Sequence, residues 1–200
     1  MGQPSSADLA ARCAGIQLLA VDVDGVLTDG AIVIDDRGVE SKNFHVRDGL
    51  AYSLWHRAGK VSAILSGRRA EVVERRAAEL RIGHVSQGLA EKEEPFRRLL
   101  RQLGLNPFQA CFVGDDLVDL PVLRAVGLAA CPADAVAEVR QAVHFVTAAR
   151  GGRGAVREVV ETILKAQGLW HGLCGFTPCQ QGNPLPDPDG TNKRAPEAGE

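Results

Sequence analysis

Residues 18–30 read LLAVDVDGVLTDG, and this stretch decides the fold. Four apolar residues lead directly into Asp22 and Asp24, with Gly25 next in the chain. A short continuous apolar run predicts a strand that is covered on both faces, as the central strands of parallel sheets are. The two aspartates therefore stand where a buried strand leaves its sheet.

Apolar runs and helical patterns alternate along the rest of the chain. We predict a three-layer, Rossmann-like α/β fold in which helices cover both faces of a parallel sheet. Folds of this kind bind ligands at the carboxyl ends of their strands. The predicted strands are 16–23, 60–66, 109–114, 127–130 and 143–146, and the predicted helices are 49–59, 69–80, 91–104, 134–141 and 154–168.

One segment interrupts this alternation. GAIVIDDRGVESKNFHVRDG (30–49) contains two strand-like stretches around a turn at 35–38, which predicts a β-hairpin inserted after the first strand. An isolated hairpin is marginal in water. We therefore expect this one to pack on the parent domain or on a neighbouring subunit.

The 200 residues are enough for one domain with a sizeable core. We expect an N-terminal extension at 1–15, a domain at 16–170 and a disordered tail at 171–200, where prolines and glycines replace the aliphatic pattern. Within that tail, Cys174 and Cys179 are interpreted as unpaired thiols rather than as a metal site, because no second pair accompanies them.

Composition argues against several classes of partner. The formal net charge is −2 with interspersed signs, which favours neither nucleic acid nor an anionic membrane. No apolar run approaches the ~20 residues of a membrane helix, and the N-terminus lacks the apolar core of a secretory signal. Five scattered cysteines predict a reduced, cytoplasmic setting.

A second acidic cluster follows the predicted strand 109–114. GDDLVD (114–119) supplies Asp115, Asp116 and Asp119. If the two strand ends lie side by side, up to five carboxylates share one crevice, and without a cation they would repel one another. Oxygen ligands of this kind predict Mg²⁺. Taken alone, GDDLVD also fits a helix N-terminus, where aspartate stabilises the helix dipole.

Two further side chains fit an anionic ligand. Ser66 ends the predicted strand 60–66 and can offer its hydroxyl to a phosphate, although a serine there can equally cap a helix. Lys92 opens the predicted helix 91–104, where a cation opposes the helix dipole. This position suggests a nearby anion, and a solvated lysine is the alternative.

The order of these motifs resembles the haloacid dehalogenase superfamily of phosphotransferases. The motifs are DVDGVLTDG, ILSGR, a lysine at a helix start and VGDDLVD, and the resemblance covers residues 16 to about 168. Further segments are similar to one branch that has no cap domain, the 3-deoxy-D-manno-octulosonate 8-phosphate (KDO 8-phosphate) phosphatases. These segments are FHVRDG (44–49), QGLAEK and GGRGAVREV (151–159). Members of this branch act in lipopolysaccharide biosynthesis. They are homotetramers assembled through the hairpin.

The resemblance implies a role for each motif residue. Asp22 is the nucleophile, and Asp24 is the general acid and base. Successive strand residues point to opposite faces of a sheet. The strand must therefore end at Asp22, so that a turn at Gly25 brings the Asp24 side chain back toward the same phosphate. Ser66 and Lys92 bind the phosphoryl group. Mg²⁺ is held by Asp22, the backbone carbonyl of Asp24 and Asp115, and Asp116 and Asp119 support this set in an order that the motif leaves open.

The implied substrate carries a carboxylate as well as a phosphate. Arg47, Arg68 and Arg153 stand near the motifs and are candidate contacts for either anion. For each arginine alone, a surface ion pair is the alternative. Arg153 is the strongest candidate, because the flanking glycines of GGRG allow the backbone to approach a ligand closely.

Three other functions compete with this one. A phosphatase of a nine-carbon keto-deoxy sugar acid phosphate would use almost the same motifs. A non-catalytic tetramerisation module is disfavoured by the complete motif set. A phosphomutase is disfavoured because no insertion is long enough to form the helical cap that shields the intermediate from water in such enzymes.

Overall fold

The computed structural model describes residues 5–175 and contains a six-stranded parallel sheet in the order β5-β4-β1-β6-β7-β8. Every residue of β1, β6 and β7 is buried, as expected for strands that are covered on both faces. The predicted α/β fold is confirmed. The strands are β1 (Leu18–Val21), β4 (Val61–Leu65), β5 (His84–Ser86), β6 (Ala110–Val113), β7 (Leu128–Cys131) and β8 (Phe145–Val146).

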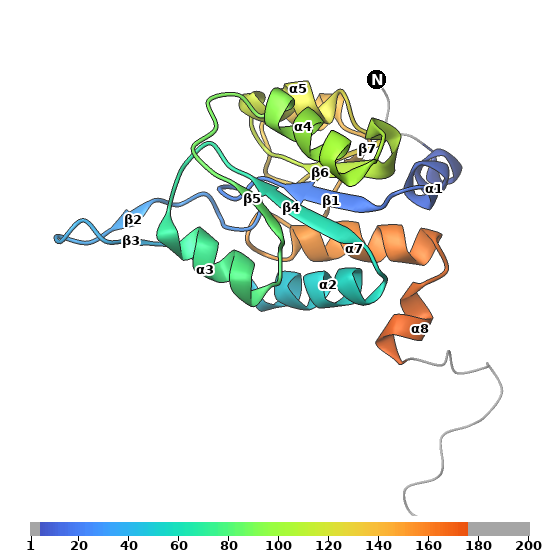
Figure 1. Cartoon of the computed structure of the whole chain (residues 1–200), viewed down its shortest axis with the longest axis horizontal. Coiled ribbons are helices and arrows are strands. Elements are labelled where there is room, and N and C mark those ends of the chain that lie inside the picture. Colours follow the sequence, from blue (N-terminus) through green and yellow to red (C-terminus); the bar gives the residue numbers. More distant parts are fainter. Residues whose placement is uncertain (1–4, 176–200) are drawn as a thin grey trace, which may run out of the picture.

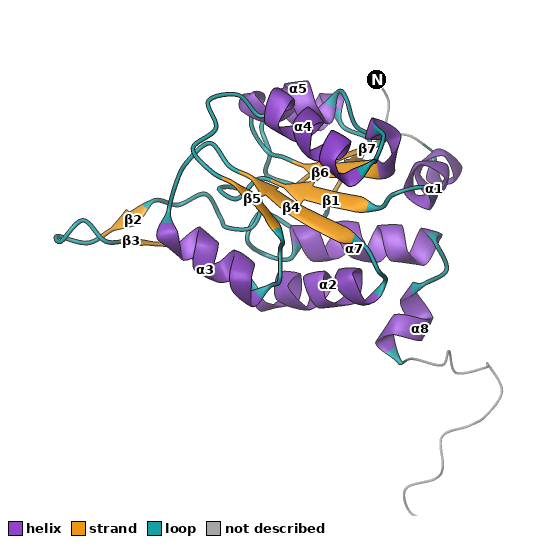
Figure 2. Ribbon diagram, in the orientation of Figure 1, coloured by secondary structure: helices purple, strands orange, loops and turns teal. Residues whose placement is uncertain are grey.

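Helices cover both faces of this sheet (Figures 1 and 2). On one face, α2, α3 and α7 enclose a core that contains Tyr52 and Trp55. On the other, α4, α5 and α6 enclose a core around Phe96 and Phe112, whose rings meet edge to face. The main helices are α2 (Val46–Arg57), α3 (Glu71–Glu79), α4 (Glu93–Leu103), α5 (Leu120–Leu123), α6 (Ala137–Ala142) and α7 (Ala155–Ala166), with 3₁₀ turns η1 (Pro107–Gln109) and η2 (Leu117–Asp119).

Each predicted strand and helix lies within three residues of its observed boundaries. The difference reaches three residues at the starts of α6 and α2, and α2 begins at Val46, inside the segment assigned to the hairpin. The His45 side chain explains this early start, because its Nδ1 accepts a hydrogen bond from the backbone N–H of Arg47 and so caps the helix. The edge strand β5 was not predicted, because its three residues are only half-buried and show no apolar run.

The predicted hairpin is present and ends before α2. Its strands are β2 (Val33–Ile34) and β3 (Glu40–Ser41), which pair antiparallel around the predicted turn. The turn is closed by a hydrogen bond from the Gly38 amide to the Asp35 carbonyl, at 2.8 Å. Figure 1 shows the hairpin projecting away from the main sheet beside α3. Its apolar side chains are exposed within this chain.

Both predicted end segments contain a helix. Within the predicted N-terminal extension, α1 (Ser6–Ala14) packs Leu9 and Cys13 into the core beside α7. The tail does not begin at 171, because α8 (Trp170–Cys174) continues the fold. Trp170 anchors α8, since its ring lies 4.8 Å from the Arg157 guanidinium. The remainder of the predicted tail, with Cys179, lies outside the described residues.

Among residues 5–175, no helix has the length and apolar character needed to cross a membrane.

The connections place a topological switch point between β1 and β6. From β1 the chain passes to β4 and then β5 on one side, and returns to β6 on the other side of β1. Open α/β sheets bind their ligands at such a crevice, beyond the carboxyl ends of the strands. Asp22 follows β1 and Asp115 follows β6, so both lie at this point.

A glycine-rich loop packs directly against the turn that follows β1. A methyl group on Gly151 would lie 1.8 Å from the carbonyl oxygen of Gly25, and the Gly152 amide donates to the Val26 carbonyl at 3.0 Å. These contacts require backbone-to-backbone packing, which any side chain at position 151 would prevent. The loop therefore supports the turn that carries the first two aspartates.

We predict that Gly151→Ala destabilises the fold by at least ~1–3 kcal/mol, the usual cost of overpacking, because the backbone of the β1 turn must move. Gly83→Ala is the matched control, since a methyl group there meets no atom within 4 Å. Thermal unfolding of both variants checks this prediction. Equal midpoints for the two variants would contradict it.

Candidate active site

Asp22 and Asp24 lie on the turn that follows β1. The Asp22 amide makes the last ladder bond, to the Val113 carbonyl at 2.9 Å. The amides of Val26 and Leu27 then donate to the Val23 carbonyl, which folds the chain back on itself. The strand therefore ends at Val21, and Asp22 is the first residue beyond it.

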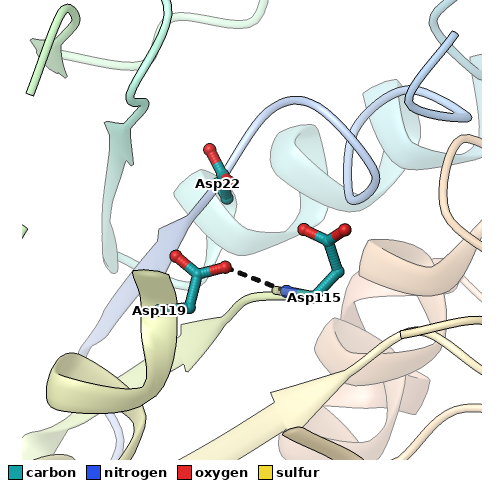
Figure 3. Close-up of side chains that lie close together, drawn as sticks. All are labelled: Asp22, Asp115 and Asp119. Atoms are coloured by element: carbon teal, nitrogen blue, oxygen red, sulfur yellow. Dashed lines mark hydrogen bonds between the residues drawn. The ribbon is translucent and has the colours of Figure 1, made fainter. Parts of the chain in front are cut away.

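Asp22, Asp115 and Asp119 converge at the switch point. One carboxylate oxygen from each lies within 4.8 Å of the other two. Figure 3 shows that Asp22 comes from the end of β1, Asp115 from the loop after β6, and Asp119 from the helical turn that follows. The predicted meeting of the two acidic clusters is thus present in the structure.

Lys92 neutralises part of this negative charge. Its Nζ lies 2.8 Å from Asp22 Oδ2 and 2.7 Å from Asp119 Oδ1, and its side chain is 2% exposed. Lys92 occupies the N-cap of α4 without making a cap bond, and its ammonium instead pairs with the acidic cluster. Burial alone would lower the pKa of Lys92, but the two carboxylates outweigh burial and raise it.

Asp119 holds the cluster together from a fully buried position. Its Oδ2 accepts a hydrogen bond from the Asp115 amide at 3.0 Å and a longer one from the Asp116 amide at 3.4 Å. The exposed Asp116 instead caps η2 by accepting from the Leu117 amide at 2.7 Å. The sequence motif did not distinguish the roles of these two residues. In the structure, Asp119 lies in the acidic cluster and Asp116 caps η2.

The acidic cluster fits a bound divalent cation. Burial, followed by the neighbouring carboxylates, raises the pKa of Asp115 to about 8. Burial also raises the pKa of Asp22 to about 6, although Lys92 opposes the shift. Asp115 Oδ1 is buried and has no hydrogen-bond partner among the described residues. A cation that coordinates these oxygens would supply the missing partner and the missing positive charge.

Gly25 makes room for Asp115. A methyl group at position 25 would lie 2.1 Å from Asp115 Oδ2, and the backbone of Gly25 has φ of +85°. Both the space and the left-handed conformation require glycine. The DxDG motif therefore contributes to the site of the second acidic motif as well as to its own turn.

Asp24 lies outside the cluster of three and carries its own partners. Its carboxylate is bonded to the Lys42 ammonium, and its Oδ2 lies 3.7 Å from Arg68 Nε. Lys42 was not recognised in the sequence, where a single lysine in a hairpin carries no signal of a role. The contribution of the Asp24 backbone carbonyl to metal binding stays a prediction.

Ser66 lies at the same edge of the sheet, because β4 runs beside β1. It is 2% exposed, and its backbone pairs with Ser86 and Leu89. The helix-cap alternative does not apply, since the N-cap of α3 is Ala70. Ser66 is therefore free of a capping role at the predicted phosphate position.

The three candidate arginines have different surroundings. Arg68 reaches Asp24, as described above, and its Nη2 also donates to Glu40 at 3.2 Å. Arg153 is exposed, 3.7 Å from Asp29 in the turn that follows β1. Arg47 is exposed on the first turn of α2 and makes no ion pair within residues 5–175. Within this chain, therefore, the structure brings Arg68 and Arg153 toward the site but not Arg47.

A doubly wound sheet with clustered carboxylates and a buried lysine at its switch point is typical of a phosphoryl-transfer hydrolase. A family model described as haloacid dehalogenase-like hydrolase matches residues 44–127. The relatives described next, at 42% and 45% identity over most of the chain, show that the chain belongs to this family.

Two of the similar curated proteins are named 3-deoxy-D-manno-octulosonate 8-phosphate phosphatase. The protein of that name from Yersinia pestis is 42% identical over 174 residues, which is 87% of this chain and 93% of the relative. The one from Escherichia coli K12 is 45% identical over 165 residues, or 82% of this chain and 88% of the relative.

Solved structures give the same result. The phosphatase of this name from Moraxella catarrhalis, crystallised with magnesium, phosphate and KDO, superposes with a TM-score of 0.83 at 37% identity. The superposition covers 84% of this chain and 97% of that one.

We predict that the metal-free protein loses stability as pH rises from about 4 to about 8. Across this range the folded state keeps a proton on Asp115 that the unfolded state releases, because burial raises the folded pKa to about 8. Mg²⁺ should therefore raise the melting temperature more at pH 8 than at pH 5, and by several degrees, since ~1 kcal/mol shifts the midpoint of such a domain by roughly 2–4 °C.

Asp115→Asn should flatten this pH dependence and remove the Mg²⁺ effect, whereas Asp36→Asn, at an exposed hairpin carboxylate, should behave as wild type. Thermal unfolding in chelator and in Mg²⁺ at both pH values measures these effects. An equal Mg²⁺ shift in wild type and Asp115→Asn would contradict the assignment of Asp115.

Proposed function

We propose that this protein is a Mg²⁺-dependent phosphatase that hydrolyses KDO 8-phosphate to KDO and phosphate, in lipopolysaccharide biosynthesis. The observation that carries the proposal is the convergence of Asp22, Asp115, Asp119 and Lys92 at the switch point. The relatives of known name support the choice of substrate.

Asp22 is the proposed nucleophile. Its Oδ1 accepts a hydrogen bond from the Val23 amide at 2.6 Å, and its Oδ2 lies beside Lys92, so the orientation of the carboxylate is fixed. The carboxylate attacks the phosphorus atom, the bond between phosphorus and the sugar oxygen breaks, and an aspartyl phosphate forms. This covalent step divides one difficult displacement into two easier ones.

Asp24 is the proposed acid and base. It donates a proton to the departing sugar oxygen, and then accepts one from the water that attacks the phosphorus of the aspartyl phosphate. This second step releases inorganic phosphate and restores Asp22. Acid–base assistance of this kind contributes roughly 10²–10⁴-fold to the rate.

The remaining residues bind and neutralise the transferred group. Ser66 offers its hydroxyl to a phosphoryl oxygen, and Lys92 balances charge on both the phosphate and Asp22. Mg²⁺, held by Asp22, the Asp24 carbonyl and Asp115, would offset the charge of the phosphoryl oxygens when bound. Asp119 keeps Lys92 and the Asp115 backbone in place.

The sugar carboxylate needs a separate cation. We assign this role to Arg68 and Arg153, which lie on loops beside the turn that follows β1. Arg47 is exposed and makes no ion pair among the described residues, so we propose that it serves the site of a neighbouring subunit.

The exposed hairpin supports assembly as a homotetramer. Four apolar side chains of the hairpin are about half exposed: Ile32 (55%), Val33 (49%), Ile34 (59%) and Val39 (53%). Apolar side chains gathered on a two-stranded hairpin need a partner to bury them. We propose that other copies of the chain supply this partner. We also retain the cytoplasm as the expected location, because Cys13, Cys111 and Cys131 are free, buried thiols.

We predict that wild-type protein releases phosphate from KDO 8-phosphate only with a divalent cation, and that Asp22→Asn abolishes this activity while the melting temperature stays within a few degrees. A malachite-green assay over KDO 8-phosphate, its nine-carbon analogue and simple sugar phosphates measures both preference and metal dependence.

Preferred turnover of the nine-carbon analogue would keep the mechanism and change the substrate. Retention of most activity by Asp22→Asn would contradict the nucleophile assignment. A folded wild-type protein that hydrolyses no member of the panel would favour the non-catalytic tetramerisation module.

We predict that Ile34→Lys reduces the oligomer to smaller species, because a charge on the apolar face of the hairpin must be desolvated on assembly. Phe108→Lys is the matched control, since Phe108 is 77% exposed on η1, outside the hairpin. Light scattering coupled to gel filtration gives the mass of each. An unchanged tetramer in Ile34→Lys would contradict the proposed interface.

A further inference from the structure

Lys42 is a shielded lysine that the proposed mechanism does not yet use. It directly follows β3, where the hairpin returns to the domain, and its side chain is 1% exposed. Lysine is almost never so completely buried unless its ammonium is paired. The groups that pair with the Lys42 ammonium therefore indicate what this lysine does.

Those partners are two carboxylates, one of them the proposed acid and base. The Lys42 ammonium donates to Asp24 Oδ1, and it lies 2.9 Å from Glu40 Oε1. Arg68 completes a ring of four charged groups, because it approaches the same Glu40 oxygen and the other oxygen of Asp24. Each oxygen of the Asp24 carboxylate thus faces a different cation.

The two cations of this ring differ in how firmly they are held. The Arg68 side chain is 45% exposed and its Nε lies 3.7 Å from Asp24, beyond the usual hydrogen-bond range. It can turn toward a substrate at little cost. The Lys42 side chain is shielded from solvent and bonded on two sides, so it is the fixed member of the pair.

Orientation matters for Asp24 because it stands in a turn and not in the ladder of the sheet. A catalytic acid must reach the leaving oxygen, and later the attacking water, within hydrogen-bond distance. A carboxylate in a turn samples several rotamers unless a neighbour holds one oxygen. Lys42 is placed to hold Oδ1 and to leave Oδ2 for the proton transfers.

We propose that Lys42 is a positioning residue that fixes the Asp24 carboxylate for its two proton transfers. The inference rests on the proposed function. Lys42 itself exchanges no proton: Asp24 gives one to the leaving oxygen and recovers one from water, and the ammonium stays bonded to it throughout. Because Lys42 belongs to the hairpin segment, the placement of the hairpin and the orientation of Asp24 are linked.

The test compares Lys42→Met and Lys42→Arg on two substrates whose leaving groups differ. KDO 8-phosphate needs a proton on its departing sugar oxygen, whereas p-nitrophenyl phosphate releases a stable anion without one. Lys165→Met is the matched control, since that lysine pairs with Glu161 at 2.7 Å on the surface of α7. Steady-state and rapid-mixing kinetics are measured for every variant.

We expect Lys42→Met to lower kcat for KDO 8-phosphate by roughly 10- to 100-fold, a part of the full acid–base contribution, with little change in KM. With p-nitrophenyl phosphate, the same variant should show a burst of p-nitrophenolate followed by slow turnover. The first step then needs no acid, while hydrolysis of the aspartyl phosphate still needs the base. Lys42→Arg should recover most of the activity, and Lys165→Met should match wild type.

Three results would overturn the proposal. A raised KM with unchanged kcat would make Lys42 a substrate contact. Faster turnover of either substrate would mean that Lys42 restrains Asp24. Equal loss on both substrates without a burst would indicate a general structural role.

Should Lys42→Met fail to fold, Lys42→Gln decides the question, because it removes the ammonium from Asp24 and keeps a polar side chain beside Glu40. A burst in Lys42→Gln supports the proposal, and wild-type kinetics in that variant overturn it. The wild-type protein could be inactive on KDO 8-phosphate and active on p-nitrophenyl phosphate. That result would refute the proposed substrate, and the burst experiment with p-nitrophenyl phosphate would still test the role of Lys42.

Discussion

The ion pairs that Lys92 forms with Asp22 and Asp119 are the interaction on which the site depends. They join the end of β1, the start of α4 and the turn after β6 at one buried point. Buried charges are tolerated only when paired. Lys92 therefore offsets part of the negative charge of the buried carboxylates, and the negative charge that remains creates an affinity for a cation.

This arrangement explains why the parts of the site come from distant segments. The parallel order of the strands brings the ends of β1 and β6 together, and the loop at Gly151 buttresses the turn after β1. The hairpin adds a further layer, with apolar side chains that are exposed and Lys42 directed inward to Asp24. Under our proposals, the hairpin segment thus contributes both to assembly of the oligomer and to the acid–base chemistry of Asp24.

Most of the sheet and the acidic cluster could be predicted from the sequence, because both depend on local patterns. The apolar run before Asp22 and the run before Asp115 each identify a buried strand, and parallel strands bring their carboxyl ends to the same edge. The half-buried β5 and the helix α1 were missed, because the first has no apolar run and the second is short, with only Cys13 buried.

The relative roles of Asp116 and Asp119 depended on side-chain direction. Both follow the same strand, and only the path of η2 turns one outward and the other into the core. Lys42 gave no signal either, because its importance comes from a contact with Asp24 that spans the whole hairpin. Contacts between residues that are distant in the sequence cannot be predicted from local sequence patterns.

The central claim is that phosphate passes through Asp22. Rapid acid quenching of the enzyme during turnover of KDO 8-phosphate, followed by mass spectrometry of the peptide that contains residues 18–30, tests it directly. The account predicts a phosphorylated peptide with the added group on Asp22, present during turnover and lost once substrate is exhausted. Turnover at a normal rate with no phosphorylated peptide, or with the phosphate on Asp24, would contradict it.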